Sequence, residues 1–158
     1  YDGIFRRAVL NFKFHNCGAY AELLSHEMVR SIKDVYRDRE FDLVTCVPMH
    51  KDTLRKRGYN QAELLAKECA RLLGIEYADL LVKTKKNKTQ HSIKAAERAK
   101  NVIGVYSPID KNLIKGKRIL IIDDIITTGS TLGECARILN KCKCGEICCC
   151  TLCTSLLI

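Results

Sequence analysis

The 158-residue sequence has no tryptophan, only ten aromatic residues and no long apolar run. No stretch approaches the roughly 18 consecutive apolar residues that a membrane-spanning helix needs, so we expect no membrane insertion. Few of the aromatic residues lie within the basic segments, which argues against a stacking platform for single-stranded nucleic acid. The length fits one well-buried α/β domain and is too short for two domains of normal size. The apolar fraction of 47% fits a globular protein.

Cysteine is abundant, with ten residues, six of them between positions 142 and 153. A CxxC pair occurs at Cys150 and Cys153 within the strand-like run 147–157, but it is not repeated at the spacing of a zinc ribbon. Adjacent cysteines on a strand point to opposite faces and do not easily converge on one ion. We interpret the cysteines as reduced, small buried apolar residues, which predicts a cytoplasmic location. A metal or redox role for this region is the minor alternative.

The formal net charge is +9, and basic residues gather in the segments 51–57, 83–100 and 111–118. This balance favours anionic partners, either phosphorylated small molecules or nucleic acid. The alternative is a solvated basic face.

Strand-like and helical patterns alternate along the chain. Apolar residues recur at helical spacing over 19–36 and over 62–73, where Gly74 ends the pattern. Strand-like runs lie at 41–47, 80–82, 102–106, 118–122 and 147–157. The alternation predicts an α/β fold of three layers, with a mostly parallel central sheet flanked by helices. Ligands of such sheets bind beyond the carboxyl ends of the strands, where Pro48 and Asp123 are expected.

The most informative passage follows the apolar run 118–122. Asp123 and Asp124 stand at the carboxyl end of this predicted strand, and a hydroxyl-rich loop follows, made of Thr127, Thr128, Gly129, Ser130 and Thr131. Thr131 and Glu134 have the spacing of a capping box, which predicts a helix that starts there. Helix N-termini favour anions, and carboxylates accept hydrogen bonds from hydroxyls, so the passage describes a ribose 5-phosphate site. The alternative is a solvated Asp pair before an ordinary capped helix.

The segment from Ile121 to Thr131 resembles the phosphoribosyl-pyrophosphate (PRPP) signature of type I phosphoribosyltransferases. The resemblance implies that Asp123 and Asp124 are the catalytic residues that hold the ribose hydroxyls, and that residues 127–131 wrap the 5-phosphate. It also places the pyrophosphate loop at Met49, His50 and Lys51, with Arg55, Lys56 and Arg57 as candidates to assist. A lone loop histidine is more often a surface residue, so a catalytic His50 is the less favoured interpretation.

A polar, Lys-rich segment runs from Lys83 to Asn101 between two predicted strands. Loops of about this length are usually functional lids or disordered. In type I phosphoribosyltransferases a flexible loop in this place closes over PRPP, which makes Lys85, Lys86, Gln90 and Arg98 candidates to contact the pyrophosphate or the transferred group. A short helix over 95–100, with Arg98 merely solvated, is the alternative.

Further elements are similar to the competence-protein ComF family. The run Leu54–Ala66 looks like its RGxNQAxxLA element, in which Asn60 and Gln61 either contact the ligand or start the following helix. Residues 12–15, 90–92 and 98–102 also resemble that family. We therefore expect residues 1–158 to form a single phosphoribosyltransferase-like domain, with an N-terminal helical hood region over 1–40 and an α/β core over 41–158.

ComF relatives usually begin with a Cys-rich zinc module, and nothing of that kind precedes Tyr1. The chain therefore looks like the phosphoribosyltransferase portion alone, or a shortened protein. Because the first residue is not Met, the presence of an upstream targeting signal stays open.

The resemblance implies a phosphoribosyltransferase, of the glycosyltransferase class, that binds PRPP with Mg²⁺ and transfers or hydrolyses the 5-phosphoribosyl group. Mg²⁺ is expected mainly on the PRPP oxygens, without direct protein ligands. The acceptor is an unidentified nucleobase or amine, and the residues do not decide between a monomer and a homo-oligomer. The alternative is a non-catalytic ComF-type accessory protein of DNA uptake and natural competence, which binds PRPP or single-stranded DNA.

Overall fold

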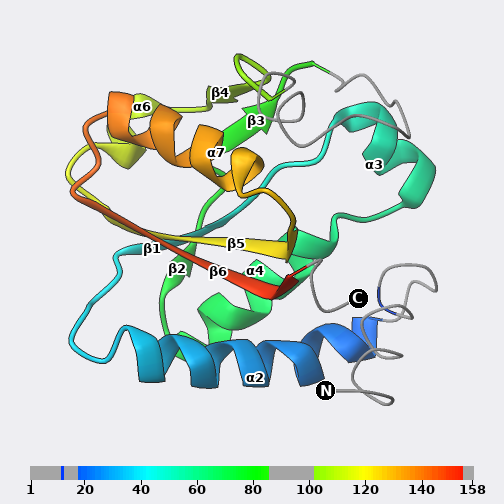
Figure 1. Ribbon diagram of the computed structural model, residues 1–158, viewed down its shortest axis with the longest axis vertical. Helices are drawn as coiled ribbons and strands as arrows, with labels where there is room; N and C mark the ends of the chain where they lie inside the picture. The colour runs from blue at the N-terminus through cyan, green and yellow to red at the C-terminus, as the bar shows by residue number, and fades with distance from the viewer. Residues whose placement is uncertain (1–11, 13–17, 86–101, 155–158) are drawn as a thin grey trace.

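A computed structural model describes residues 12, 18–85 and 102–154 of the chain (Figure 1). The first half contains α2 (Gly18–Val35), β1 (Leu43–Cys46), α3 (Lys51–Arg57), α4 (Gln61–Leu73), β2 (Glu76–Tyr77) and β3 (Leu81–Lys83). The second half contains β4 (Tyr106–Pro108), α6 (Lys111–Ile114), β5 (Arg118–Ile126), α7 (Ser130–Lys141) and β6 (Glu146–Thr154).

Four strands form a parallel sheet in the order β2-β1-β5-β6. Strand β1 is buried along its whole length and β5 is buried from Ile119 to Asp123, as expected for central parallel strands that are covered on both faces. This arrangement confirms the α/β fold with a parallel central sheet flanked by helices (Figure 1). The predicted strand over 80–82 lies outside this sheet, since β3 pairs antiparallel with β4. The strand predicted over 102–106 is displaced, because β4 begins only at Tyr106.

Helices cover both faces of the sheet, with α2 and α4 on one side and α7 on the other (Figure 1). Leu120 and Ile122 of β5 pack towards α2 and α4, whereas Ile119 and Ile121 pack towards α7. All four side chains are fully buried, and each such burial contributes about 1.5–3 kcal/mol. The sheet is thereby fixed between its helices, which holds the carboxyl ends of β1 and β5 side by side.

Cys148, Cys149 and Cys150 of β6 alternate between these two faces, whereas Cys153 packs on the α2 and α4 side. Cys148 and Cys150 pack on the α2 and α4 side, and Cys149 packs on the α7 side. Cys148 is buried, while Cys149, Cys150 and Cys153 are half-buried. Within the described residues, no group of three or more His, Cys, Asp or Glu side chains is placed to hold a metal ion. None of the described helices is both long and apolar enough to cross a membrane.

Helix α7 begins at Ser130, so the predicted start at Thr131 with a capping box is wrong. The N-cap is Gly129, whose φ of 74° lies in the left-handed region and which has no side chain to cap the helix. Glu134 does not reach back to the helix start. Its carboxylate is buried, pairs with Arg137 at 2.6 Å and accepts the Gly104 N–H at 2.9 Å. The Glu134 carboxylate therefore bonds to Arg137 of the same helix and to the distant Gly104 N–H instead of capping the helix.

Candidate active site beyond the carboxyl ends of the strands

A cavity of about 290 Å³ lies beyond the carboxyl ends of β1 and β5. The loop after β1 and the end of β5 form two of its walls, and α3, α4, α7 and the β3–β4 pair complete it. Its lining residues are Val47, Pro48, Met49, His50, Thr53, Arg57, Asn60, Gln61, Lys83, Tyr106, Asp123, Asp124, Ile125 and Thr131. Parallel topology predicts a ligand site at this edge of the sheet.

The two aspartates at the end of β5 differ in burial. Asp123 is 8% exposed, whereas Asp124 is half-buried. The Asp124 N–H donates to Oδ1 of Asp123, and the Ile125 N–H donates to Oδ1 of Asp124, both at 2.9 Å. Burial, followed by the negative charge of Asp124, raises the pKa of Asp123 to about 8, while Lys83 opposes this shift. A buried carboxyl beside a second carboxylate in a cavity is typical of a functional site.

Lys83 and Tyr106 come to the cavity from the paired strands β3 and β4, where they stand opposite each other. The Lys83 ammonium lies 5.5 Å from the centroid of the Tyr106 ring, in a cation–π contact. Burial lowers the pKa of Lys83 and raises the pKa of Tyr106, and a hydrogen bond with Thr131 partly offsets the latter shift. Neither residue stood out in the sequence, because their pairing joins positions that are 23 residues apart (106 minus 83).

His50 is buried, at 9% exposed, so the expectation of a surface histidine is wrong. The reason is local, because His50 is the N-cap of α3, a helix where the sequence suggested a loop. Its Nδ1 accepts the Asp52 N–H at 3.2 Å. The ring therefore has a fixed place in the cavity wall rather than a free position in solvent.

The structure confirms that Asn60 and Gln61 start the following helix, while their contact with a ligand stays a prediction. Gln61 is the first residue of α4, and both residues line the cavity. The Asn60 side chain makes no helix cap. Instead its Nδ2 donates to the Val47 carbonyl oxygen at 3.1 Å, which ties the start of α4 to the loop after β1.

The predicted hydroxyl loop lies partly at the cavity. Thr131 lines it, whereas Thr127 and Thr128 are exposed and Ser130 is half-exposed. The Thr128 Oγ1 and Ser130 Oγ hydroxyls lie 2.8 Å apart and hydrogen-bond to each other. Gly129 is half-exposed and turns the chain into α7.

The residues proposed to contact the pyrophosphate separate into two groups. Met49, His50 and Arg57 line the cavity, but Lys51 is exposed on α3 and is not part of the lining. Lys85 is exposed two residues beyond β3. Lys86, Gln90 and Arg98, the other candidates of the proposed flexible loop, lie outside the described residues.

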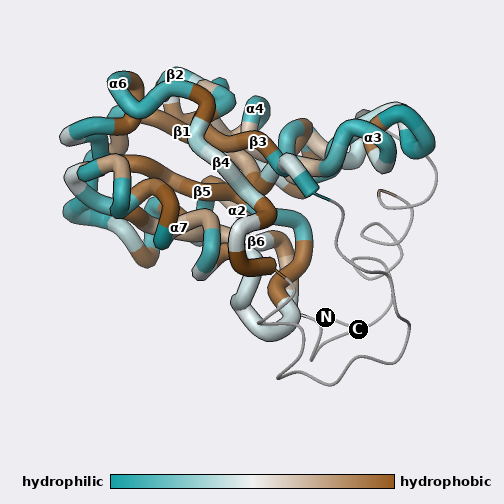
Figure 2. Tube along the Cα trace, turned by 90° about the horizontal axis from the view of Figure 1, so that it is seen from above, coloured by the Kyte–Doolittle hydropathy of each residue, from teal (hydrophilic) through white to brown (hydrophobic). Residues whose placement is uncertain are grey.

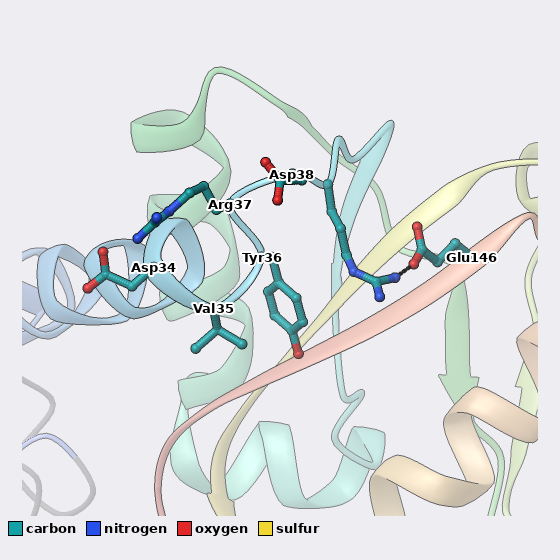
Figure 3. Close-up of a pocket in the computed structure, with 7 residues that line it drawn as sticks. Asp34, Val35, Tyr36, Arg37, Asp38 and Glu146 are labelled. Carbon is teal, nitrogen blue, oxygen red and sulfur yellow. Dashed lines mark ion pairs between the residues drawn. The ribbon is translucent and has the colours of Figure 1, made fainter.

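A larger hollow, of about 650 Å³, lies at the opposite end of the sheet between the end of α2 and the start of β6. Arg39 and Glu146 form an ion pair here, which Figure 3 marks with a dashed line to the Glu146 carboxylate. This hollow faces the amino ends of the strands, where parallel sheets do not usually bind ligands. Its size therefore does not make it the better candidate.

The parallel sheet, with paired acids and a hydroxyl loop leading into a helix at its carboxyl edge, defines the class of type I phosphoribosyltransferase folds. The adenine phosphoribosyltransferase from Saccharomyces cerevisiae, solved in complex with D-DIAB and adenine, has a similar fold. That structure aligns with a TM-score of 0.58 and 15% identity, over 91% of this chain and 73% of its own. At this identity the likeness shows the fold alone.

Residues 60–156 match the phosphoribosyl transferase domain model, and the chain belongs to this family. Competence protein F from Haemophilus influenzae is 33% identical over 144 residues, which is 88% of this chain and 63% of that protein. DNA utilization protein YhgH from Escherichia coli K12 is 30% identical over 101 residues, 63% of this chain and 44% of that protein. The chain thus spans less than two thirds of these relatives. Their similarity confirms the predicted resemblance to the ComF family.

Proposed function

We propose that this domain binds PRPP together with Mg²⁺ and transfers or hydrolyses its 5-phosphoribosyl group. The observation that carries the proposal is the pair Asp123 and Asp124 at the carboxyl end of β5, in one cavity with Thr131 and with the loop after β1. Carboxyl oxygens accept hydrogen bonds, so this pair suits the vicinal hydroxyls of a ribose. The Asp124 N–H donates to one oxygen of Asp123, which holds this carboxyl group in the cavity wall.

The other cavity walls suit the two phosphorylated ends of PRPP. Helix α7 has twelve residues, and its first-turn N–H groups, with the Thr131 hydroxyl, offer donors to the 5-phosphate. Arg57 and Lys83 bring positive charge to the cavity, where the pyrophosphate would need it. The cavity thus combines acceptors for a diol with donors and cations for two anionic groups.

The donor set at the cavity fits Mg²⁺ in the manner that this ion prefers. Among the described residues the carboxylates that line the cavity are Asp123 and Asp124, and no closed group of metal ligands is formed. Mg²⁺ commonly uses one or two carboxylates with phosphate oxygens and retained waters. When bound with PRPP, it would neutralise charge on the departing pyrophosphate.

The residues of the chain have separate roles in this reaction. The aspartates orient the ribose, and the negative charge of Asp124 stabilises an oxocarbenium-like centre as the bond to pyrophosphate breaks. Arg57 and Lys83 stabilise the departing anion. The acceptor is a nucleobase or an amine in transfer, and water in hydrolysis.

Calorimetry with PRPP and Mg²⁺, and a pyrophosphate-release screen over nucleobases, amines and water, test the proposal. We expect the wild-type chain to bind PRPP and the Asp124→Asn variant to bind at least about tenfold more weakly, since hydrogen bonds to charged groups contribute about 1.5–3 kcal/mol. Glu76→Gln is the matched control, because Glu76 is an exposed carboxylate on β2 that does not line the cavity. Absence of PRPP binding by the wild-type chain would overturn the proposal. So would PRPP binding that Asp124→Asn leaves unchanged.

A second candidate is a non-catalytic accessory protein that handles single-stranded DNA, which fits the name of the Escherichia coli relative. Its structural support is α3, on which Lys51, Arg55, Lys56 and Arg57 are all exposed. Figure 2 shows this helix as a hydrophilic segment at one end of the molecule. Contacts to phosphates make DNA affinity fall steeply with salt.

The two candidates are separable because Arg55 and Lys56 do not line the cavity. The double variant Arg55→Glu, Lys56→Glu should retain PRPP affinity and lose affinity for a single-stranded oligonucleotide, measured by fluorescence anisotropy over a salt series. Salt-sensitive DNA binding without pyrophosphate release from any acceptor would favour the accessory function. Salt-independent or absent DNA binding would exclude it.

A further inference from the structure

Strand β4 contacts the start of α7, where the proposed 5-phosphate site lies. Tyr106, the first residue of β4, is only 5% exposed, and its hydroxyl forms a hydrogen bond with that of Thr131. Two residues earlier in the chain, the Gly104 N–H donates to the buried carboxylate of Glu134 at 2.9 Å. Because Thr131 and Glu134 stand in the first two turns of α7, these two bonds join the β4 segment to that end of the helix.

Helix α7 has no side chain at its N-cap that could fix the first turn. The N-cap is Gly129, which offers no side-chain oxygen to the first N–H groups. Leu132 and Cys135 of α7 belong to one apolar cluster with Val105 and Tyr106. The position of the first turn therefore depends on its contacts with the β4 segment rather than on a cap of its own.

The Tyr106 ring is held in one orientation at the cavity wall. Lys83 stands directly opposite on β3, and its ammonium lies 5.5 Å from the centroid of the ring. A buried tyrosine usually directs its hydroxyl to one partner, and here that partner is Thr131. Because both residues line the cavity, the bond between their hydroxyls lies beside the proposed phosphate position.

We infer that Tyr106 is a positioning residue for the 5-phosphate, because its hydroxyl donates to Thr131 Oγ1 while the Thr131 hydroxyl donates to the phosphate. The inference rests on the proposed function. Above its second pKa of about 6, a phosphate monoester offers only acceptor oxygens. The single hydroxyl hydrogen of Thr131 therefore goes to the phosphate, which leaves the threonine oxygen to accept from Tyr106. Each bond in such a chain polarises the next, so Tyr106 acts on the ligand through Thr131.

Four single substitutions isolate this hydroxyl pair. Tyr106→Phe removes one hydroxyl and keeps the ring with its Lys83 contact, Thr131→Val removes the other, and Thr131→Ser retains it. Tyr36→Phe is the matched control, since the Tyr36 hydroxyl donates to the Cys149 carbonyl oxygen at 2.9 Å and does not line the cavity. It removes a tyrosine hydroxyl of similar structural importance far from the proposed phosphate.

The experiment is a double-mutant cycle, in which the full chain is titrated calorimetrically with ribose 5-phosphate and with pyrophosphate, each with Mg²⁺. Tyr106→Phe should bind ribose 5-phosphate about threefold to tenfold more weakly than wild type, and Thr131→Val about tenfold more weakly. Adding Tyr106→Phe to Thr131→Val should cause no further loss, whereas adding it to Thr131→Ser should have its full effect. Pyrophosphate affinity should stay unchanged in all these variants, and Tyr36→Phe should leave both affinities unchanged.

Melting temperatures of the same variants test the hydrogen bond without any ligand. Thr131→Val leaves the buried Tyr106 hydroxyl without its partner, so it should melt below wild type. The double variant Tyr106→Phe, Thr131→Val removes both hydroxyls and should melt above Thr131→Val. A double variant that melts lower still would contradict the bond between the two hydroxyls.

The binding outcomes separate this inference from the proposed function. If wild type binds PRPP and ribose 5-phosphate, and Tyr106→Phe binds them equally well, the positioning role is overturned and PRPP binding stands. If Tyr106→Phe weakens binding in the Thr131→Val background as much as in wild type, Tyr106 does not act through Thr131 and the inference is wrong. An equal loss of pyrophosphate affinity would mean a general loosening of the site, which also contradicts it. If wild type binds none of these ligands, the proposed function fails, and this inference fails with it.

Discussion

At the scale of single residues, Asp123 carries two unfavourable features in the folded protein. It is buried, and the carboxylate of Asp124 lies beside it. Removing an ionised carboxylate from water costs free energy, and a neighbouring negative charge adds to that cost. Proteins retain such a costly group where it binds a ligand. Asp123 is therefore expected to lower the free energy of unfolding at neutral pH while it binds the ribose hydroxyls.

The pH dependence of stability tests this cost. The pKa of Asp123 is raised from its ordinary value of 3.8 to about 8, so the folded state holds a proton that the unfolded state has released between these pH values. The free energy of unfolding therefore falls as pH rises from about 4 to about 8. Asp123→Asn should remove this fall, so it should be more stable than wild type at pH 8 by at least about 1.4 kcal/mol, the equivalent of one pKa unit, but not at pH 4.

Urea unfolding of both proteins at pH 4, 6 and 8 checks the expected difference. Glu76→Gln is the control, since it removes an exposed carboxylate and should leave the pH profile of the wild type unchanged. Parallel profiles for Asp123→Asn and wild type would mean that Asp123 is already ionised near pH 4 in the folded state. PRPP should bind Asp123→Asn weakly even where that variant is the more stable protein.

At the scale of helices and strands, the sequence predicts those elements whose apolar pattern directly reflects which of their residues are buried. The continuous apolar run of β5 and the helical spacing in α4, ended by left-handed Gly74, were readable because each pattern reflects local geometry. The start of α7 was not, because Glu134 bonds to Arg137 and to the Gly104 N–H rather than to its own helix start. The pairing of β3 with β4 was missed because it joins distant segments.

Two glycines near the ends of α7 give a matched pair for testing this packing. A Cβ on Gly145 would lie 2.7 Å from the Gly116 carbonyl oxygen, where the loops before β5 and β6 are held together by the Gly145 N–H bond to the Lys117 carbonyl oxygen. Gly145→Ala should therefore destabilise the fold by about 1–3 kcal/mol. A Cβ on Gly133, within α7, meets nothing within 4 Å, so Gly133→Ala should stabilise by about 0.5–1 kcal/mol.

Thermal unfolding of the two alanine variants beside wild type measures both effects. The opposite signs are the informative result, because both substitutions add the same methyl group. A stable Gly145→Ala protein would show that the two loops can separate without cost. A destabilised Gly133→Ala protein would show that this face of α7 is covered by residues other than those described.

At the scale of the whole molecule, the candidate site is assembled from seven segments, namely the loop after β1, the end of β5, α3, α4, α7, β3 and β4. The sequence made only some of them recognisable. The acids and hydroxyl loop were recognisable because they are adjacent in the chain. Lys83, Tyr106 and the inward position of His50 depend on how β3, β4 and α3 pack around β5, which no local pattern contains. The three adjacent cysteines 148–150 show the converse, since their alternation on β6 followed directly from strand geometry.

Thiol accessibility tests that whole arrangement at once. Of the nine free cysteines in the described residues, five are buried, and burial raises the pKa of Cys46 and Cys69 to about 12 and of Cys149 and Cys150 to about 11. The thiolate is the reactive form, so a thiol reagent at pH 8 should modify these groups slowly.

The experiment uses Cys17→Ser, because Cys17 lies outside the described residues. Half-exposed Cys144, in the loop before β6, should react before the buried thiols. Unfolding in urea should expose all nine thiols to the reagent together. Rapid modification of most thiols without urea would contradict this packing, and one equivalent of zinc by elemental analysis would restore the metal interpretation of these cysteines.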